Sequence, residues 1–229
     1  MDLATLLRDA PKFHADESGR PHSWQLADEV LELIDDAVHQ GSTTLETGAG
    51  VSTVLFAIKR SRHFCVVPAA GEVELIRRYC AERDVSTGTI TFCVDQSERV
   101  LPKLDLPELD LVLIDGAHRF PSPFIDWFYT AARLKVGGTL IVDDTNLWTA
   151  GILKQFLCEE PEWRLEREIA ARTALFVKTQ PLTTREWNYQ PFVLRNSHPA
   201  GSPSHTPAAT GLVHRSQLLL RRFTRRIAG

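Results

Sequence analysis

Residues 109–118 read Leu-Asp-Leu-Val-Leu-Ile-Asp-Gly-Ala-His. The segment from Leu111 to Ile114 is apolar at every position, which is typical of a strand that is covered on both faces of its sheet. Polar residues begin abruptly at Asp115, so we expect the strand to end there. This short segment therefore indicates a central strand of a sheet with helices on both sides.

Strand-like and helix-like segments alternate on either side of this strand. We expect strands at 43–47, 64–67, 89–94, 109–114, 138–142, 164–169 and 174–178, and helices at 23–40, 52–59, 71–83, 123–134 and 149–159. Such alternation predicts an α/β protein with a doubly wound, mostly parallel sheet. A short connection joins the last two strands, so we expect them to form an antiparallel pair at one edge.

The charge of the chain divides it into two parts. The 229 residues carry a net charge of −3, but residues 180–229 hold seven arginines, no lysine and a single acid, which gives +6 there and leaves −9 for residues 1–179. Residues 196–211 have the composition of a linker. We therefore predict a catalytic domain at 1–179 and a basic, partly disordered extension at 180–229 that the fold does not need.

Composition excludes several functions. An acidic domain is a poor general ligand of nucleic acid, so any partner with negative charge would contact the basic extension. No apolar run approaches the length of a membrane span, and the first residues lack the pattern of a secretory signal, which predicts a cytoplasmic protein. The four cysteines have neither zinc-site nor disulfide spacing and are expected to be buried thiols. A homo-oligomer is compatible with the sequence.

A glycine-containing turn follows the first strand of the alternating pattern. Gly48 and Gly50 flank Ala49 between a predicted strand and a predicted helix, where the backbone can turn sharply and approach a nucleotide-like ligand. Glu46 lies two residues before Gly48, and its carboxylate would repel a pyrophosphate but suit a cationic ligand. S-adenosylmethionine carries an ammonium and a sulfonium and has no phosphate, so we expect it as the cofactor.

A dinucleotide is the main competing ligand. It would favour a third glycine, where this chain has Thr53, and an acid after the next strand, where this chain has Pro68. Asp95, Gln96 and Ser97 end another strand and are predicted to bind the adenine.

Three carboxylates are predicted to meet at the carboxyl edge of the sheet. Asp115 ends one strand, and Asp143 and Asp144 end the neighbouring strand. Close carboxylates repel each other unless they are partly protonated or share a cation, and oxygen ligands select Mg²⁺, Mn²⁺ or Ca²⁺. His118 lies three residues after Asp115, and an imidazole there can remove a proton near neutral pH.

The motifs together resemble a known family. The segments 46–57 (ETGAGVSTVLFA), 115–118 (DGAH) and 134–144 (LKVGGTLIVDD) are similar to those of class I S-adenosylmethionine-dependent methyltransferases, especially the bacterial branch that includes metal-dependent O-methyltransferases of antibiotic sugars. The resemblance implies a Rossmann-like sheet of seven strands with the last strand antiparallel. It also implies that Asp115, Asp143 and Asp144 bind metal and that Asp115 contacts the cofactor. Many members have an acid where this chain has Pro68, and the nearest acids here are Glu72 and Glu74.

These observations predict a metal-assisted methyltransferase that acts on a hydroxyl of a small molecule, such as a sugar or a secondary metabolite. His118 is the expected base, and Trp148 is either a stacking wall for the acceptor or a packing aromatic. The alternatives are a metal-independent methyltransferase, a non-catalytic S-adenosylmethionine-binding scaffold and, with less support, a nicotinamide-dependent oxidoreductase.

Overall fold

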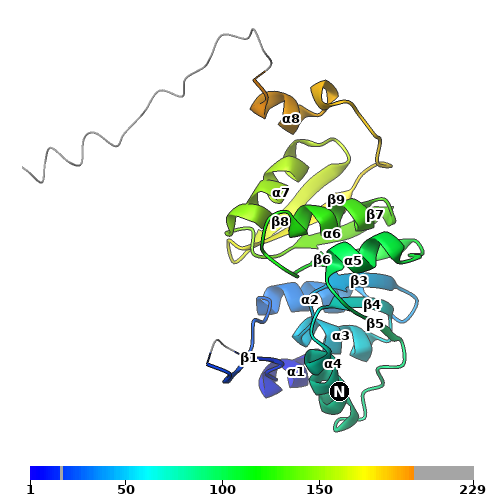
Figure 1. Cartoon of the computed structure of the whole chain (residues 1–229). Helices are drawn as coiled ribbons and strands as arrows, with labels where there is room; N and C mark the ends of the chain where they lie inside the picture. The colour runs from blue at the N-terminus through cyan, green and yellow to red at the C-terminus, as the bar shows by residue number, and fades with distance from the viewer. Residues whose placement is uncertain (16–17, 199–229) are drawn as a thin grey trace, which may run out of the picture. The chain divides into compact units, whose positions relative to one another are not determined.

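The computed structural model describes residues 1–15 and 18–198. Its centre is a seven-stranded sheet with the order β5-β4-β3-β6-β7-β9-β8 (Figure 1). The strands are β3 (Thr43–Thr47), β4 (Arg62–Val67), β5 (Ile90–Val94), β6 (Leu109–Ile114), β7 (Leu134–Val142), β8 (Trp163–Ile169) and β9 (Thr173–Lys178). All seven predicted strands are present, with ends that shift by a few residues.

Strand directions confirm the predicted doubly wound topology. Strands β5, β4, β3, β6 and β7 are parallel neighbours, and β9 runs antiparallel to both β7 and β8. The chain winds outward in one direction through β4 and β5, then returns to β6 on the other side of β3. Ligands of such sheets bind outside the carboxyl ends of the strands at this reversal, which places the site beside β3 and β6.

Helices cover both faces of the sheet (Figure 1). Side chains alternate along β6, so that Leu111 and Leu113 pack into one core cluster and Val112 and Ile114 into the other. The first cluster lies under α1 (Leu3–Asp9), α2 (Asp28–Ala37), α3 (Val51–Lys59) and α4 (Ala70–Ala81), and the second under α5 (Ser97–Val100), η1 (Leu101–Lys103), α6 (Ser122–Ala131) and α7 (Trp148–Glu159). This explains why β6 is apolar at consecutive positions.

The N-terminal region differs most from the sequence prediction. The helix expected at 23–40 spans only Asp28–Ala37, because residues 23–27 are not helical and Ser23 instead faces a cavity. Helix α1 was not predicted, nor was the small hairpin of β1 (His14–Ala15) and β2 (Pro21–His22). These elements are too short to show a clear period in the sequence.

Residues beyond Thr179 contact the domain, and the compact unit runs from Met1 to Leu194. Arg185 forms ion pairs with the buried residues Glu160 and Glu162. Thr183 donates a hydrogen bond to Glu162 over 2.9 Å. Further on lie η2 (Trp187–Tyr189) and α8 (Pro191–Asn196), and the arginines of the predicted basic extension from Arg215 onward fall outside the described residues. These contacts involve residues after 179, and the domain boundary expected there stays a prediction.

Two further expectations can be compared with the structure. Within the described residues, no helix is long and apolar enough to cross a membrane. All four cysteines are free thiols. Cys65 and Cys80 are buried as predicted, but Cys93 is half-buried and Cys158 is exposed, because Cys158 lies outside the apolar face of α7.

Candidate functional site

A cavity of about 680 Å³ lies at the carboxyl ends of β3, β6 and β7. A smaller cavity of about 100 Å³ adjoins it and shares four of its lining residues, Gly48, Pro68, Gly116 and Ala117. Residues from distant parts of the chain complete the larger cavity, namely His14, His22, Ser23, Trp24, Gln25, Ala49, Glu72, Asp115, His118, Asp144 and Arg172. The cavity therefore lies where the topology predicts a ligand.

The turn after β3 requires glycine at residue 48. Gly48 has a φ of +90°, and a Cβ atom there would lie 2.2 Å from the backbone oxygen of Asp115. The Gly48 N–H donates a hydrogen bond to the carbonyl of Val66 over 2.9 Å. The turn is thus fitted tightly against the ends of β4 and β6, and Gly48 and Ala49, both predicted to bind the cofactor, line the cavity.

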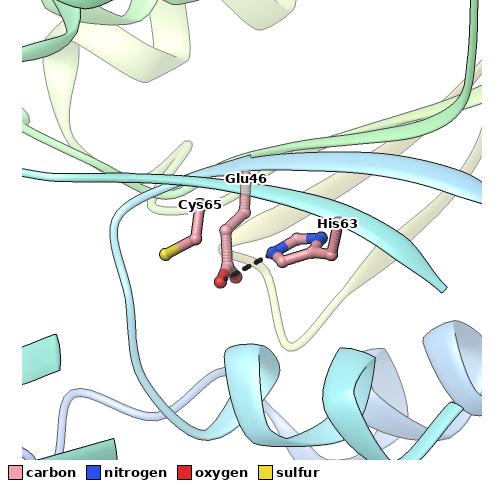
Figure 2. A group of neighbouring side chains, drawn as sticks. All are labelled: Glu46, His63 and Cys65. Atoms are coloured by element: carbon pink, nitrogen blue, oxygen red, sulfur yellow. Dashed lines mark hydrogen bonds and ion pairs between the residues drawn. The ribbon is translucent and has the colours of Figure 1, made fainter. Parts of the chain in front are cut away.

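Glu46 is not among the residues that line the cavity. Its side chain is 1% exposed and lies on the side of the sheet that α3 covers (Figure 2). Ser52 donates a hydrogen bond to Oε2 over 2.7 Å, Thr53 donates a short one to Oε1, and Nε2 of His63 lies 3.1 Å from Oε1. The predicted direct contact between Glu46 and the cofactor does not fit this orientation.

The Glu46 network instead supports the glycine turn. The Gly50 N–H donates a hydrogen bond to Oγ1 of Thr53 over 3.0 Å, so the turn and the Glu46 carboxylate share one hydroxyl. Beneath Glu46, the His63 ring stacks on Phe56 with a centroid distance of 4.0 Å, and its Nδ1 lies 2.8 Å from Oγ1 of Thr44.

Cys65 completes a buried group with Glu46 and His63, whose donor atoms lie within 4.8 Å of one another. Figure 2 shows the three side chains on the same side of the sheet. Burial, with a smaller contribution from Glu46, raises the pKa of the Cys65 thiol well above its ordinary value. Both Glu46 oxygens already accept hydrogen bonds from Ser52 and Thr53, and Oε1 also lies 3.1 Å from His63. We therefore interpret this group as structural.

The smaller cavity includes two of the three residues predicted to bind adenine. Gln96 and Ser97 line it, together with Glu98 and Arg119, which the sequence did not indicate. Asp95 is not among its lining residues; its carboxylate accepts a hydrogen bond from the Gln96 N–H over 2.7 Å.

A buried carboxyl lies behind the smaller cavity. Asp126 of α6 is fully buried, and neither of its oxygens makes a hydrogen bond of normal geometry, although the hydroxyls of Ser97 and Thr47 are near. Burial raises the pKa of Asp126 to about 6, and the two hydroxyls offset only part of that shift. Asp126 therefore loses its proton in the range just below neutral pH.

The N-terminal segment forms one wall of the larger cavity. Nδ1 of His14 lies 3.1 Å from Oε1 of Glu72, and the ring of His14 packs on that of Trp24 at 4.9 Å. Glu72 lines the cavity beside Pro68, whereas Glu74 is exposed and does not. Glu72 is thus the better placed of the two acids that follow Pro68.

The structure brings together two of the three predicted metal carboxylates, with His118. Donor atoms of Asp115, His118 and Asp144 lie within 4.8 Å of one another. Nε2 of His118 is 3.1 Å from Oδ2 of Asp144. Burial and the nearby charges of Asp143, Asp144 and Glu46 raise the pKa of Asp115 well above its ordinary value.

Asp143 is not part of this group. Its side chain is fully buried; Oδ1 accepts a short hydrogen bond from Thr173, and Oδ2 accepts one from Arg172 over 2.5 Å. Arg172 also lies 3.1 Å from Oδ1 of Asp144 and lines the cavity. The single guanidinium of Arg172 thus lies beside two of the three predicted metal ligands, Asp143 and Asp144, and the binding of a metal ion by all three carboxylates stays a prediction.

An exposed aromatic pair flanks His118. The rings of Phe120 and Trp148 lie 6.0 Å apart, and Trp148 is 68% exposed. Thr149 donates a short hydrogen bond to the His118 carbonyl, which ties the start of α7 to the segment that follows β6. Trp148 is thus a surface aromatic near the cavity rather than a residue packed in the core.

Residues 45–145 match a family model described as a methyltransferase domain. This segment contains the glycine turn, the four residues that line both cavities, and the carboxylates that follow β6 and β7 up to Asp144. No curated protein matches the sequence.

Solved structures with this fold have low sequence identity to the chain. A protein from Klebsiella pneumoniae described as an O-methyltransferase is 15% identical, with a TM-score of 0.61 over 78% of this chain and 90% of that one. The cofactor-bound protein Rv0187 from MTB is 18% identical, with a TM-score of 0.59 over 77% and 88%. The O-methyltransferase TomG from Streptomyces achromogenes, in complex with S-adenosylmethionine, is 16% identical, with a TM-score of 0.56 over 68% and 82%. These similarities show a shared fold.

Proposed function

We propose that this protein is an S-adenosylmethionine-dependent O-methyltransferase that acts on a hydroxyl of a small molecule, with His118 as the base. The observation that carries the proposal is the position of the His118–Asp144 pair in the same cavity as the glycine turn. The two functions of such an enzyme, holding a nucleoside and removing a proton, thus meet within one enclosed space.

The cavities fit the proposed cofactor. The glycine at residue 48 lets the turn pack against the backbone of Asp115, and the turn lines both cavities. We assign the adenine to the smaller cavity beside Gln96 and Ser97, and the ribose to the region of Pro68 and Glu72. When bound, S-adenosylmethionine supplies a methyl group that is already activated by the sulfonium.

The remaining chemistry is proton removal and alignment. If the Nε2–H of His118 donates to Asp144, then Nδ1 keeps a lone pair that can accept the acceptor's hydroxyl proton. The acceptor oxygen forms its new bond to the methyl carbon as the carbon–sulfur bond breaks, and that electron pair stays on sulfur. Holding the reacting atoms in line accounts for much of the rate.

A metal-assisted transferase is the second candidate. It is favoured by the convergence of Asp115, His118 and Asp144 within 4.8 Å, a mixed oxygen and nitrogen set that suits several divalent ions. His118 would then be a ligand and not the base. The sugar hydroxyl predicted from the sequence belongs to this candidate, since it came from the resemblance to metal-dependent enzymes.

The experiment is to titrate the protein with S-adenosylmethionine in a calorimeter and then to follow S-adenosylhomocysteine formation with a panel of sugars, phenols and other hydroxylated compounds. Binding followed by turnover that survives EDTA supports the proposal. Loss of turnover with EDTA supports the metal-assisted candidate. Binding without turnover on any acceptor supports a non-catalytic scaffold, and absence of binding contradicts the proposal.

A further inference from the structure

We propose that Arg172 supplies the positive charge among the carboxylates of Asp115, Asp143 and Asp144, here called the acidic edge. We further propose that it prevents Asp143 and Asp144 from binding a divalent metal ion. Arg172 would then be a positioning residue, which leaves Asp144 available to orient His118. The part of this inference that concerns His118 rests on the proposed function, whereas the part that concerns metal binding does not.

The contacts of the two carboxylates carry the inference. Oδ1 of Asp143 accepts from Thr173, and Oδ2 accepts from Arg172. Oδ1 of Asp144 lies 3.1 Å from the same guanidinium nitrogen, and Oδ2 lies 3.1 Å from His118. All four oxygens therefore have a partner, and a metal ion at this pair would have to displace charge-assisted hydrogen bonds, which are among the stronger ones in proteins.

Arg172 is held in place through its backbone as well. It follows Ala170 and Ala171, which have φ values of +50° and +53° in the turn between β8 and β9. Its carbonyl accepts hydrogen bonds from the N–H and the hydroxyl of Thr145, the residue after Asp144, over 2.7 and 2.9 Å. Left-handed alanines are unfavourable in isolation, so surrounding contacts must hold this turn. These contacts hold the backbone at Arg172, and the ion pairs with Asp143 and Asp144 hold its guanidinium.

The charge of Arg172 is secure. Its hydrogen bond to Asp143, with the charges of Asp143, Asp144 and Asp115, raises the pKa of Arg172 further above its already high ordinary value. A positive charge so close to Asp144 also repels a divalent ion at the remaining donors, Asp115 and His118. We therefore expect weak metal affinity at Asp143 and Asp144 and also at the group formed by Asp115, His118 and Asp144.

The test measures Mn²⁺ binding to the full chain by electron paramagnetic resonance, without cofactor or acceptor. We expect weak binding by the wild-type protein, binding at least tenfold tighter by Arg172→Gln, and weak binding by Arg172→Lys, which retains the charge. Arg164→Gln is the matched control, because Arg164 is an exposed arginine of β8 that pairs with Glu166 and does not line the cavity. It should bind Mn²⁺ as the wild type does.

Stoichiometric, tight binding by the wild type that Asp144→Asn abolishes would overturn the proposal, and this comparison remains valid even if Arg172→Gln does not fold. Equal affinities of the wild type and a folded Arg172→Gln would also overturn it. Calorimetric titration with S-adenosylhomocysteine and an assay of methyl transfer on the same samples test the proposed function separately from the role of Arg172 in metal binding. If the cofactor does not bind, the proposed function fails, while the Mn²⁺ affinities still decide the role of Arg172.

Discussion

Nε2 of His118 lies 3.1 Å from Oδ2 of Asp144, across the carboxyl ends of two neighbouring strands. His118 follows β6 and Asp144 follows β7, so the parallel register of these strands brings the two side chains together. An imidazole held by a carboxylate has a fixed tautomer and orientation. This pair is the part of the cavity that is suited to proton transfer.

Substitution of His118 by Ala is expected to lower kcat by roughly 10²- to 10⁴-fold, the usual contribution of a general base. Asp144→Asn should have a smaller effect, because the imidazole remains but is less well oriented. Calorimetry should show unchanged cofactor affinity in both variants. His39→Ala, which lies outside the larger cavity, is the control. Full activity of His118→Ala would exclude its assignment as the base.

Glu46→Ala is expected to reduce stability first and cofactor binding only as a consequence. The change would leave the buried groups of Ser52, Thr53 and His63 without their acceptor, which costs about 3 kcal/mol or more of the free energy of unfolding. Urea denaturation measures this loss, with the exposed residue Glu74 changed to Ala as the control. A variant of wild-type stability that no longer binds S-adenosylmethionine would instead restore the direct contact predicted from the sequence.

Asp126 should make stability depend on pH. Its pKa is about 6 in the folded protein and near 3.8 in the unfolded chain, so folding favours the protonated form and stability falls as the pH rises from about 4 to 6. The difference corresponds to a cost of up to about 3 kcal/mol at neutral pH. Asp126→Asn should therefore match the wild type near pH 4 and be more stable near pH 7.5, as measured by denaturation at both pH values. A difference that does not change with pH would contradict this.

Gly48→Ala is expected to lower stability through both backbone strain and a steric clash, whereas Gly137→Ala introduces backbone strain alone. Gly48 and Gly137 have φ values of +90° and +84°, but only at Gly48 would the new Cβ meet a neighbour, the backbone oxygen of Asp115 at 2.2 Å. Gly137→Ala should cost about 1–2 kcal/mol through its backbone conformation alone. Gly48→Ala should cost clearly more and abolish cofactor binding. Thermal unfolding and calorimetry compare the two, and equal losses would show that the close approach to Asp115 is not rigid.

Truncation after Leu194 should leave the domain stable, whereas truncation after Gln180 should not. The shorter chain removes Arg185 and leaves the buried residues Glu160 and Glu162 without their cation, a loss that typically costs 3–5 kcal/mol. Arg185→Ala should reproduce most of the effect in the full-length chain. Equal melting temperatures for the two truncations would support the domain boundary at 179 that the charge distribution suggests.

The sheet could be predicted because its signals are local. Consecutive apolar positions in β6, and alternation with helical segments, do not depend on knowing which residues meet in space. The glycine turn was equally visible, since Gly48 is required by a backbone conformation that few other residues adopt. The fold class, and the edge of the sheet at which the cavity lies, therefore followed from the sequence.

The partners within the site were less predictable, because they depend on orientation and on distant segments. Arg172 comes from a hairpin far along the chain, and nothing near it in the sequence marks it as a neighbour of Asp143. Glu46 was expected to face the ligand, but successive residues of a strand point to opposite faces, and its position sends it under α3. Asp126 resembles any polar residue of an amphipathic helix until the packing around it is known.

The walls of the larger cavity have separate origins in the chain. Gly48, Ala49 and Gly116 come from the ends of central strands, whereas His14, Ser23 and Trp24 belong to the N-terminal segment. Changes in that segment would leave the register of the sheet untouched. Under the proposed function, substitutions in the N-terminal segment can therefore change which acceptor fits the cavity while the glycine turn beside the cofactor stays the same.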